Sequence, residues 1–197
     1  LAGKQLQLYY QPIVELPTGL INKAEALLRW YHPELGLINP ADFISIAEET
    51  RMIIDIGDWV FRTAAQKVKQ WRASHCARFQ ISINTSPVQF RRDIALHKTW
   101  LGFLQELELP GQSIVIEITE GLLLDAGSGV TSRLRSFREA GIQISMDDFG
   151  TGYSSLGYLK KFDIDHLKID QSFVQSLAPD SNDLALCEAI IVMAHKL

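Results

Sequence analysis

The sequence predicts an α/β fold built on a mostly parallel β-sheet, and three observations support this. At 197 residues, the chain is long enough for one large domain or two small ones with a substantial core. After an initial hairpin, alternating apolar runs and segments with helical spacing follow one another, which favours parallel strands joined by right-handed crossovers. Polar side chains fall near the carboxyl ends of several strands, where α/β barrels carry their chemistry.

The first half of the chain is predicted to contain a hairpin, a loop, two helices and a third strand. In order, these elements are Leu6–Leu16 and Ile21–Trp30, the loop His32–Pro40, a helix starting near Asp42, the helix Asp55–Arg72, and the strand Phe79–Asn84. The run Pro17-Thr18-Gly19 marks the hairpin turn. In the first helix, Phe43, Ile46 and Ala47 recur at helical spacing, so we expect all three to face the core.

The second half is predicted to alternate helices and strands. In order, these are the helix Trp100–Leu107, the strand Ser113–Thr119, the helix Val130–Ala140, a strand from Ile142, the helix Ser154–Lys161, the strand His166–Asp170, and an amphipathic helix Asp183–Leu197. Gly141 follows the third of these elements, and glycine is a common residue just beyond a helix end. In this half of the chain, each predicted strand is followed by a helix, which can form the crossover that parallel strands require.

Two adjacent carboxylates close the strand that begins at Ile142. Asp147 and Asp148 follow an alternating apolar run and precede the glycine-containing segment Phe149–Gly152, whose backbone can adopt angles that a β-carbon forbids. Carboxylates at such a strand end suit one or two hard divalent cations, which prefer oxygen ligands. The alternative is that Asp148 only caps the following turn.

Polar residues near the ends of five successive strands form a candidate site. They are Glu25, Asn84, Glu117, Asp147 with Asp148, and Lys168. Oxygen ligands without histidine or cysteine favour Mg²⁺ or Mn²⁺ over zinc. Lys168 would either orient a water molecule at such a site or form a salt bridge to the carboxylates. Arg29 would either grip a phosphate or form a surface ion pair.

Composition argues against several classes of protein. The net charge of −4, without a basic stripe, gives no reason to expect a nucleic-acid polymer as partner. Cys76 and Cys187 lie far apart, so neither a zinc site nor a disulfide framework is predicted, which fits a reducing cytoplasmic compartment. Without a signal peptide or a run of 18 apolar residues, this segment is not expected to insert into a membrane.

Six ordered motifs resemble those of the EAL domain family. They are Tyr10-Gln11-Pro12-Ile13, Glu25-Ala26-Leu27-Leu28-Arg29-Trp30, Asn84-Thr85-Ser86, Glu117-Ile118-Thr119-Glu120, Asp147 to Leu156, and Lys168-Ile169-Asp170. The family comprises bacterial phosphodiesterases that hydrolyse cyclic di-GMP to linear pGpG. The resemblance covers residues 1–197 as one domain. It implies a modified (β/α)₈ TIM barrel in which the first strand is antiparallel to its neighbour.

The resemblance also implies a role for each motif residue. Glu25, Asn84, Glu117 and Asp147 would hold one metal ion, Asp147 and Asp148 would hold a second, and Lys168 would contact the attacking water. The substrate contacts would come from Gln11, Leu27 and Arg29. Glu120 would anchor the loop Phe149–Ser155, and that loop would couple metal binding to contacts within a homodimer.

The resemblance leaves two other interpretations open. One is a receptor module that binds cyclic di-GMP without turnover, and the other is a scaffold with neither function. Intact Glu25 and Asp147-Asp148 favour the enzyme. The family's seventh and eighth strands have no counterpart before Leu197, and the chain begins with Leu1, so we expect a domain incomplete at its C-terminus within a longer protein. An upstream sensory or cyclase domain, and a membrane anchor in that longer protein, are further expectations.

Overall fold

The computed structural model describes residues 5–91, 95–124, 128–151, 157, 159 and 162–196. The elements in chain order are β1 Leu6–Val14, β2 Ile21–His32, β3 Gly36–Ile38, α1 Pro40–Glu49, α2 Ile53–Ser74, β4 Gln80–Asn84, α3 Pro87–Arg91, α4 Ala95–Glu106, the 3₁₀ helix η1 Gly111–Ser113, β5 Ile114–Thr119, α5 Glu120–Leu124, α6 Ser128–Glu139, β6 Gln143–Phe149, β7 His166–Ile169, α8 Gln171–Gln175 and α9 Asn182–Ala194.

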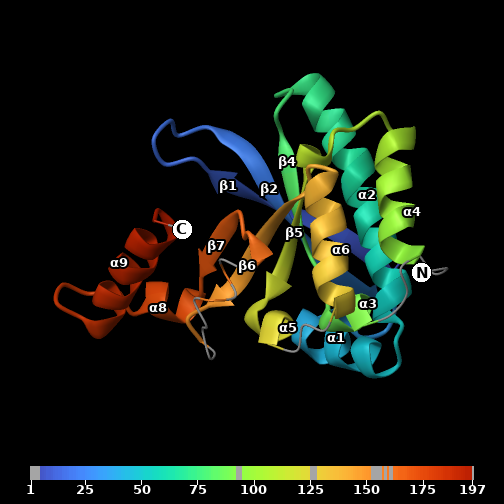
Figure 1. Cartoon of the computed structure of the whole chain (residues 1–197). Coiled ribbons are helices and arrows are strands. Elements are labelled where there is room, and N and C mark those ends of the chain that lie inside the picture. Colours follow the sequence, from blue (N-terminus) through green and yellow to red (C-terminus); the bar gives the residue numbers. More distant parts are fainter. Residues whose placement is uncertain are drawn as a thin grey trace.

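One curved sheet organises the fold (Figure 1). Its strand order is β1-β2-β4-β5-β6-β7, with β3 paired to the free part of β2. The hairpin strands β1 and β2 are antiparallel, and every later pair along the main path is parallel. The predicted hairpin and parallel crossovers are therefore confirmed. All of the parallel strands consequently end at the same edge of the sheet.

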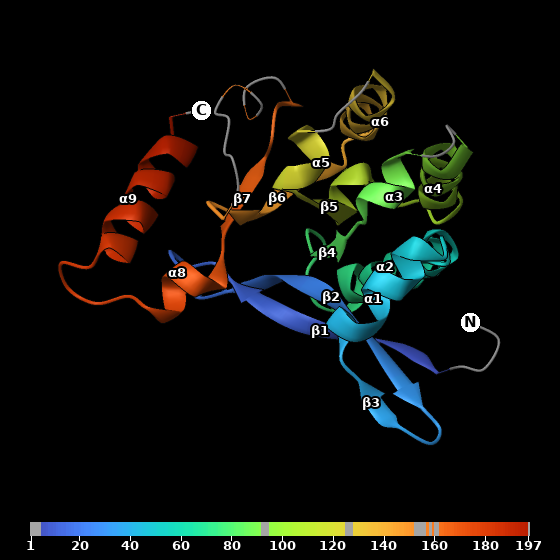
Figure 2. The same cartoon turned by 90° about the horizontal axis from the view of Figure 1, so that it is seen from below.

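Helices α2, α4 and α6 cover one face of the sheet, whereas α8 and α9 lie beside β7 (Figure 2). The core between sheet and helices is formed by alternate strand residues such as Ile81, Ile116 and Ile144, which have no exposed surface. On the helix side, the rings of Phe61 and Trp100 stack with centroids 4.3 Å apart. Because successive residues of a strand point to opposite faces of the sheet, the neighbours of each isoleucine in its own strand point to the face that these helices do not cover.

The structure corrects some of the predicted elements. The segment predicted as loop contains β3, in which Ile38 pairs with Trp30 of β2, and three residues are too few to show an alternating pattern. Helix α1 begins at Pro40, because the Asn39 side chain accepts a hydrogen bond from the Ala41 N–H (3.2 Å) and caps the helix. The short helices α3, α5 and α8 were also not predicted.

Two predictions about helix faces were wrong. Phe43 and Ala47 are buried as expected, but Ile46 is 59% exposed. The last helix, α9, is not amphipathic, because apolar Ile191 and Val192 are exposed while Ile190 is buried. The predicted helix Ser154–Lys161 lies largely outside the described residues. Among the helices that are described, none is both long and apolar enough to cross a bilayer.

Gly111 provides a test of packing between η1 and the end of α6. A β-carbon there would lie 2.0 Å from the backbone oxygen of Ala140, which has no rotamer by which to move away. We expect Gly111→Ala to lower the free energy of unfolding by about 1–3 kcal/mol. Gly102 in α4 is the control, since a β-carbon there meets nothing within 4 Å. Equal denaturation midpoints for Gly111→Ala and the unaltered chain would contradict the contact.

Candidate active site

The pairing register brings the predicted polar residues onto the sheet face that the helices leave uncovered. Glu25 of β2 lies opposite Ser82 of β4, and Asn84 at the end of β4 lies opposite Glu117 of β5. Asp147 of β6 pairs with the next inward-facing residue of β5, Thr119. These side chains alternate with buried apolar residues, such as Ala24 and Ala26 in β2 and Ile116 and Ile118 in β5. The same alternation that builds the core therefore assembles the polar cluster.

Lys168 of β7 lies at the centre of this cluster. Its Nζ donates hydrogen bonds to Glu117 Oε2 at 2.5 Å, to Asp147 Oδ2 at 3.0 Å and to Glu25 Oε2 at 3.2 Å. Asn84 Nδ2 donates to the other oxygen of Glu25 at 2.7 Å. Of the two alternatives for Lys168, the salt bridge to the carboxylates is thus present in this structure. Three of the predicted ligands therefore surround one ammonium group, and the fourth, Asn84, contacts one of the three.

Burial and neighbouring charges shift the pKa values of Glu117 and Lys168, the partners of the shortest of these ion pairs. Glu117 is only 2% exposed, and burial followed by the neighbouring charge of Glu25 raises the pKa of its carboxyl to about 7. Burial alone would lower the pKa of the Lys168 ammonium, but Glu117, Glu25 and Asp147 outweigh it, so that pKa is raised. Three carboxylates face one ammonium, which leaves two negative charges when all are ionised. The cluster therefore has an excess of negative charge that a divalent cation would balance.

The donor set fits a hard metal ion. One carboxylate oxygen from each of Glu25, Glu117 and Asp147 lies within 4.8 Å of the others. Two oxygens on opposite sides of Mg²⁺ are about 4.2 Å apart, since each Mg–O bond is about 2.1 Å. The three oxygens could thus share one ion once Lys168 Nζ, which occupies the centre of the group, moves aside. The Asn84 amide adds a carbonyl oxygen, and no described histidine or cysteine belongs to the group.

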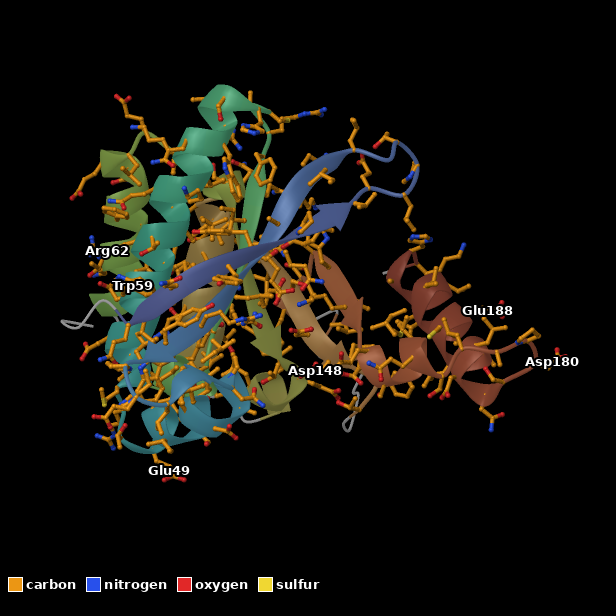
Figure 3. All side chains as sticks on the ribbon, turned by 180° about the vertical axis from the view of Figure 1, so that it is seen from behind. Glu49, Trp59, Arg62, Asp148, Asp180 and Glu188 are labelled. Atoms are coloured by element: carbon orange, nitrogen blue, oxygen red, sulfur yellow. The ribbon has the colours of Figure 1, made fainter. Side chains whose placement is uncertain are left out.

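Asp148 lies apart from the three-carboxylate group, at the edge where the parallel strands end (Figure 3). The pairing of β6 with β7 shifts register between Met146 and Phe149, and Asp148 has a left-handed backbone with φ of 54°. Such irregularities re-aim side chains next to functional sites. Burial, and then the charges of Asp147 and Asp170, raise the pKa of the Asp148 carboxyl. Asp170 is a neighbour that the sequence analysis missed.

The three predicted substrate-contact residues lie on the same face as Glu25. Gln11 of β1 is directly opposite Glu25, while Leu27 and Arg29 follow Glu25 at alternate positions of β2. Arg29 lies over the ring of Tyr9, 5.7 Å from its centroid, and donates to the Leu28 carbonyl at 2.8 Å. Among the described residues Arg29 forms no ion pair, so the alternative of a surface ion pair finds no support.

Two tyrosines flank Arg29 and were missed by the sequence analysis. The hydroxyl groups of Tyr9 and Tyr31 are 2.5 Å apart, so one donates to the other. The two tyrosines are 22 residues apart in the sequence, so no local motif indicates the pair. Both lie on the side of the hairpin opposite its buried apolar residues. Hydrogen bonding to Tyr9 is the main cause that raises the pKa of the Tyr31 hydroxyl, and the nearby Arg29 opposes it. The pair forms an aromatic support beside the Arg29 guanidinium.

Glu120 is the first residue of α5 and is buried. The loop that it was predicted to anchor, Phe149–Ser155, lies outside the described residues from position 152 onward. Its anchoring role therefore stays a prediction. Glu117 lies in β5, and α5 begins at Glu120 directly after β5 ends. One short segment thus carries both carboxylates.

Comparison with known families gives this arrangement its context. A family model described as the EAL domain matches residues 1–197. The chain belongs to the EAL domain family. This EAL domain is 38% identical over 197 residues to the bifunctional diguanylate cyclase/cyclic di-GMP phosphodiesterase MucR of Pseudomonas aeruginosa, covering 100% of the chain and 29% of MucR. It is 37% identical to the cyclic di-GMP phosphodiesterase PdeR of Escherichia coli (strain K12), with the same coverage.

Solved structures of EAL domains share the fold. The MucR phosphodiesterase in complex with c-di-GMP has a TM-score of 0.92 and 38% identity, over 99% of this chain and 78% of that one. The EAL domain of Mycobacterium smegmatis DcpA has a TM-score of 0.77 and 35% identity, over 97% and 77% of the two chains. The predicted fold class, a modified TIM barrel with an antiparallel first strand, is confirmed. The EAL domain spans about a quarter to a third of the length of the curated relatives it matches.

Proposed function

We propose that this EAL domain hydrolyses cyclic di-GMP to linear pGpG in a reaction that depends on divalent cations. The single observation that carries the proposal is the convergence of Glu25, Glu117 and Asp147 around Lys168 at the carboxyl ends of the strands. The relatives named as cyclic di-GMP phosphodiesterases support the choice of substrate. The carboxyl ends of barrel strands are also where enzymes of this architecture place their catalytic residues.

The proposed cofactors are two Mg²⁺ or Mn²⁺ ions. Glu25, Asn84, Glu117 and Asp147 would hold one ion, and Asp147 with Asp148 would hold the second, where Asp170 adds negative charge. Ions bound there would neutralise phosphate charge and lower the pKa of water. The oxygen-only donor set supports this choice of metals over zinc.

The remaining roles belong to the chain's own side chains. Once the carboxylates bind the ions, the Nζ–H groups of Lys168 that they release would orient the attacking water and stabilise the negative charge that develops on the phosphoryl oxygens. Arg29, supported by Tyr9, would hold a phosphate oxygen, and Gln11 and Leu27 would line the same surface on β1 and β2. Glu120 would hold the loop after β6 in place. These contacts fix the phosphodiester against the cluster in the orientation that hydrolysis needs.

The domain is further proposed to act as a cytoplasmic homodimer joined to other domains. MucR, which is named as a diguanylate cyclase as well as a phosphodiesterase, is more than three times as long as the part this chain matches, which supports an attached sensory or cyclase domain. Burial of the apolar residues exposed on α9, such as Ile191 and Val192, would supply area for a contact between subunits.

The test is incubation of the protein with cyclic di-GMP and either Mg²⁺ or Mn²⁺, followed by chromatographic detection of pGpG. Product should form with metal and should disappear when a chelator is added. Binding of cyclic di-GMP without any pGpG, measured by calorimetry in the same buffers, would instead support the receptor module. Neither binding nor product in the presence of both metals would refute the proposed function.

A further inference from the structure

A second polar groove opens at the opposite end of the sheet from the acidic cluster. It has a volume of about 470 Å³, and its lining includes Lys23, Arg72, Arg78, Gln80, Gln112 and Gln143. Gln80 and Gln143 are the first residues of β4 and β6, whereas Asn84 and Asp147 lie four residues further along those strands. At a rise of about 3.3 Å per residue, the two sites are separated by about 13 Å along the sheet. We call it the basic groove.

The charge of the basic groove is opposite to that of the whole chain. Three cationic side chains line it, against the single carboxylate of Glu15, although the chain carries a net charge of −4. Glu15 accepts a hydrogen bond from the Thr18 hydroxyl at 2.5 Å and keeps its negative charge. Within the described ranges, the ion pairs that form do not include Lys23, Arg72 or Arg78. The groove therefore carries an excess of two positive charges, and within those ranges none of its three cations is held in an ion pair.

Hydrogen bonds fix the amide groups of Gln80 and Gln143 and leave the Gln143 N–H groups as the amide donors that can face a ligand. Gln80 Nε2 donates to Gln143 Oε1 and to the Gln112 backbone oxygen, both at 2.7 Å. Because the Gln143 oxygen is turned toward Gln80, its Nε2 group, with two N–H donors, is turned the other way. Arg72 donates from Nη1 to the Phe79 carbonyl at 3.1 Å, which ties its guanidinium to the segment entering β4. Fixed guanidinium and amide donors suit a ligand that only accepts hydrogen bonds.

We propose that the basic groove binds an anion that carries one or more phosphate groups, at a site separate from the acidic cluster. Arg72 and Arg78 offer planar guanidinium donors that match phosphate geometry, and Lys23 adds a point charge. The acidic cluster could attract such an anion only through a bound metal. The two ends of the sheet would then recognise phosphate in different ways, and binding at the basic groove does not depend on the proposed hydrolysis.

The experiment is an NMR titration of the full chain with pyrophosphate, inorganic phosphate or guanosine monophosphate, at constant ionic strength and with a chelator to exclude metal-mediated binding. We expect saturable shifts of the Lys23, Gln80 and Gln143 amide signals. Arg78→Gln, at an exposed position, should weaken binding about tenfold or more, as expected for loss of a charge-assisted hydrogen bond. The double variant Lys23→Gln/Arg78→Gln should weaken it further.

The control is Lys69→Gln/Arg135→Gln, which removes the same charge from exposed positions on α2 and α6. It should leave the affinity unchanged. Tighter binding of guanosine monophosphate than of inorganic phosphate would identify a nucleotide as the ligand, and equal binding would identify phosphate alone. Shifts that do not saturate, or an equal loss of affinity in the control, would overturn the proposal, because attraction to net charge would then explain the data.

Discussion

Replacement of Lys168 by alanine is expected to lower kcat by about 10²–10³-fold, the effect of removing one preorganised group that stabilises developing charge. The structure adds a second expectation. Lys168 Nζ is the cation that Glu25, Glu117 and Asp147 share, so its loss makes the cluster more negative. Metal affinity in Lys168→Ala should therefore stay the same or increase. Turnover at saturating Mn²⁺ and calorimetric titration with Mn²⁺ separate the two quantities.

The matched control is Lys69→Ala, which removes the same side chain from an exposed position on α2. It should leave both quantities unchanged. A collapse of metal binding in Lys168→Ala, together with a normal rate once metal is saturating, would show that Lys168 only organises the carboxylates. Because Glu117 is buried and loses its counter-ion, the metal-free variant should also be less stable than the unaltered chain, and added Mn²⁺ should restore stability.

The clustering of the site could be predicted because it follows from periodicity. Once strands alternate and run parallel, polar residues at their carboxyl ends must meet on one face, as Glu25, Asn84, Glu117, Asp147 and Lys168 do. The two faces of the central strands could also be assigned, since a shift of one residue would expose Ile116 and bury the polar residues.

The parts that escaped prediction depend on contacts between distant residues. Strand β3 exists because Ile38 can pair with Trp30, and no local pattern of three residues reveals that. The Tyr9–Tyr31 pair joins two strands across a hairpin, and Asp170 approaches Asp148 only because the backbone at Asp148 departs from the strand. These features are set by register and backbone irregularity, which a single sequence specifies only weakly.

Tertiary context also explains the errors on helix faces. Helical spacing places Phe43, Ile46 and Ala47 on one side of α1, but the rest of the protein covers only part of that side. Ile46 consequently lines an open groove together with Trp30 and Met52 and is not buried in the core. Apolar residues lie on all sides of α9, so the periodicity of the sequence does not indicate which side is buried. Contacts with β7 and α8 determine the buried side.

Replacement of Glu25 by alanine is expected to abolish turnover at low metal concentration. Glu25 offers Oε2 to Lys168 and Oε1 to the Asn84 amide, so one carboxylate organises two neighbours as well as offering a ligand. Loss of a residue that only supports a metal ligand costs about 10–100-fold in metal affinity or activity, and loss of a direct ligand should cost at least as much. Calorimetric titration with Mn²⁺ should show weaker binding by at least that factor.

Glu25→Gln separates the ligand role from the structural one. The glutamine can still accept the hydrogen bond from Asn84 Nδ2 through its carbonyl oxygen, but it lacks the negative charge that a metal ion and Lys168 require. We therefore expect Glu25→Gln to be nearly as inactive as Glu25→Ala, while Glu34→Ala, at an exposed position after β2, remains fully active. Normal turnover and metal affinity in Glu25→Gln would show that Glu25 acts by holding Asn84, and the ligand set would have to be sought among the other carboxylates.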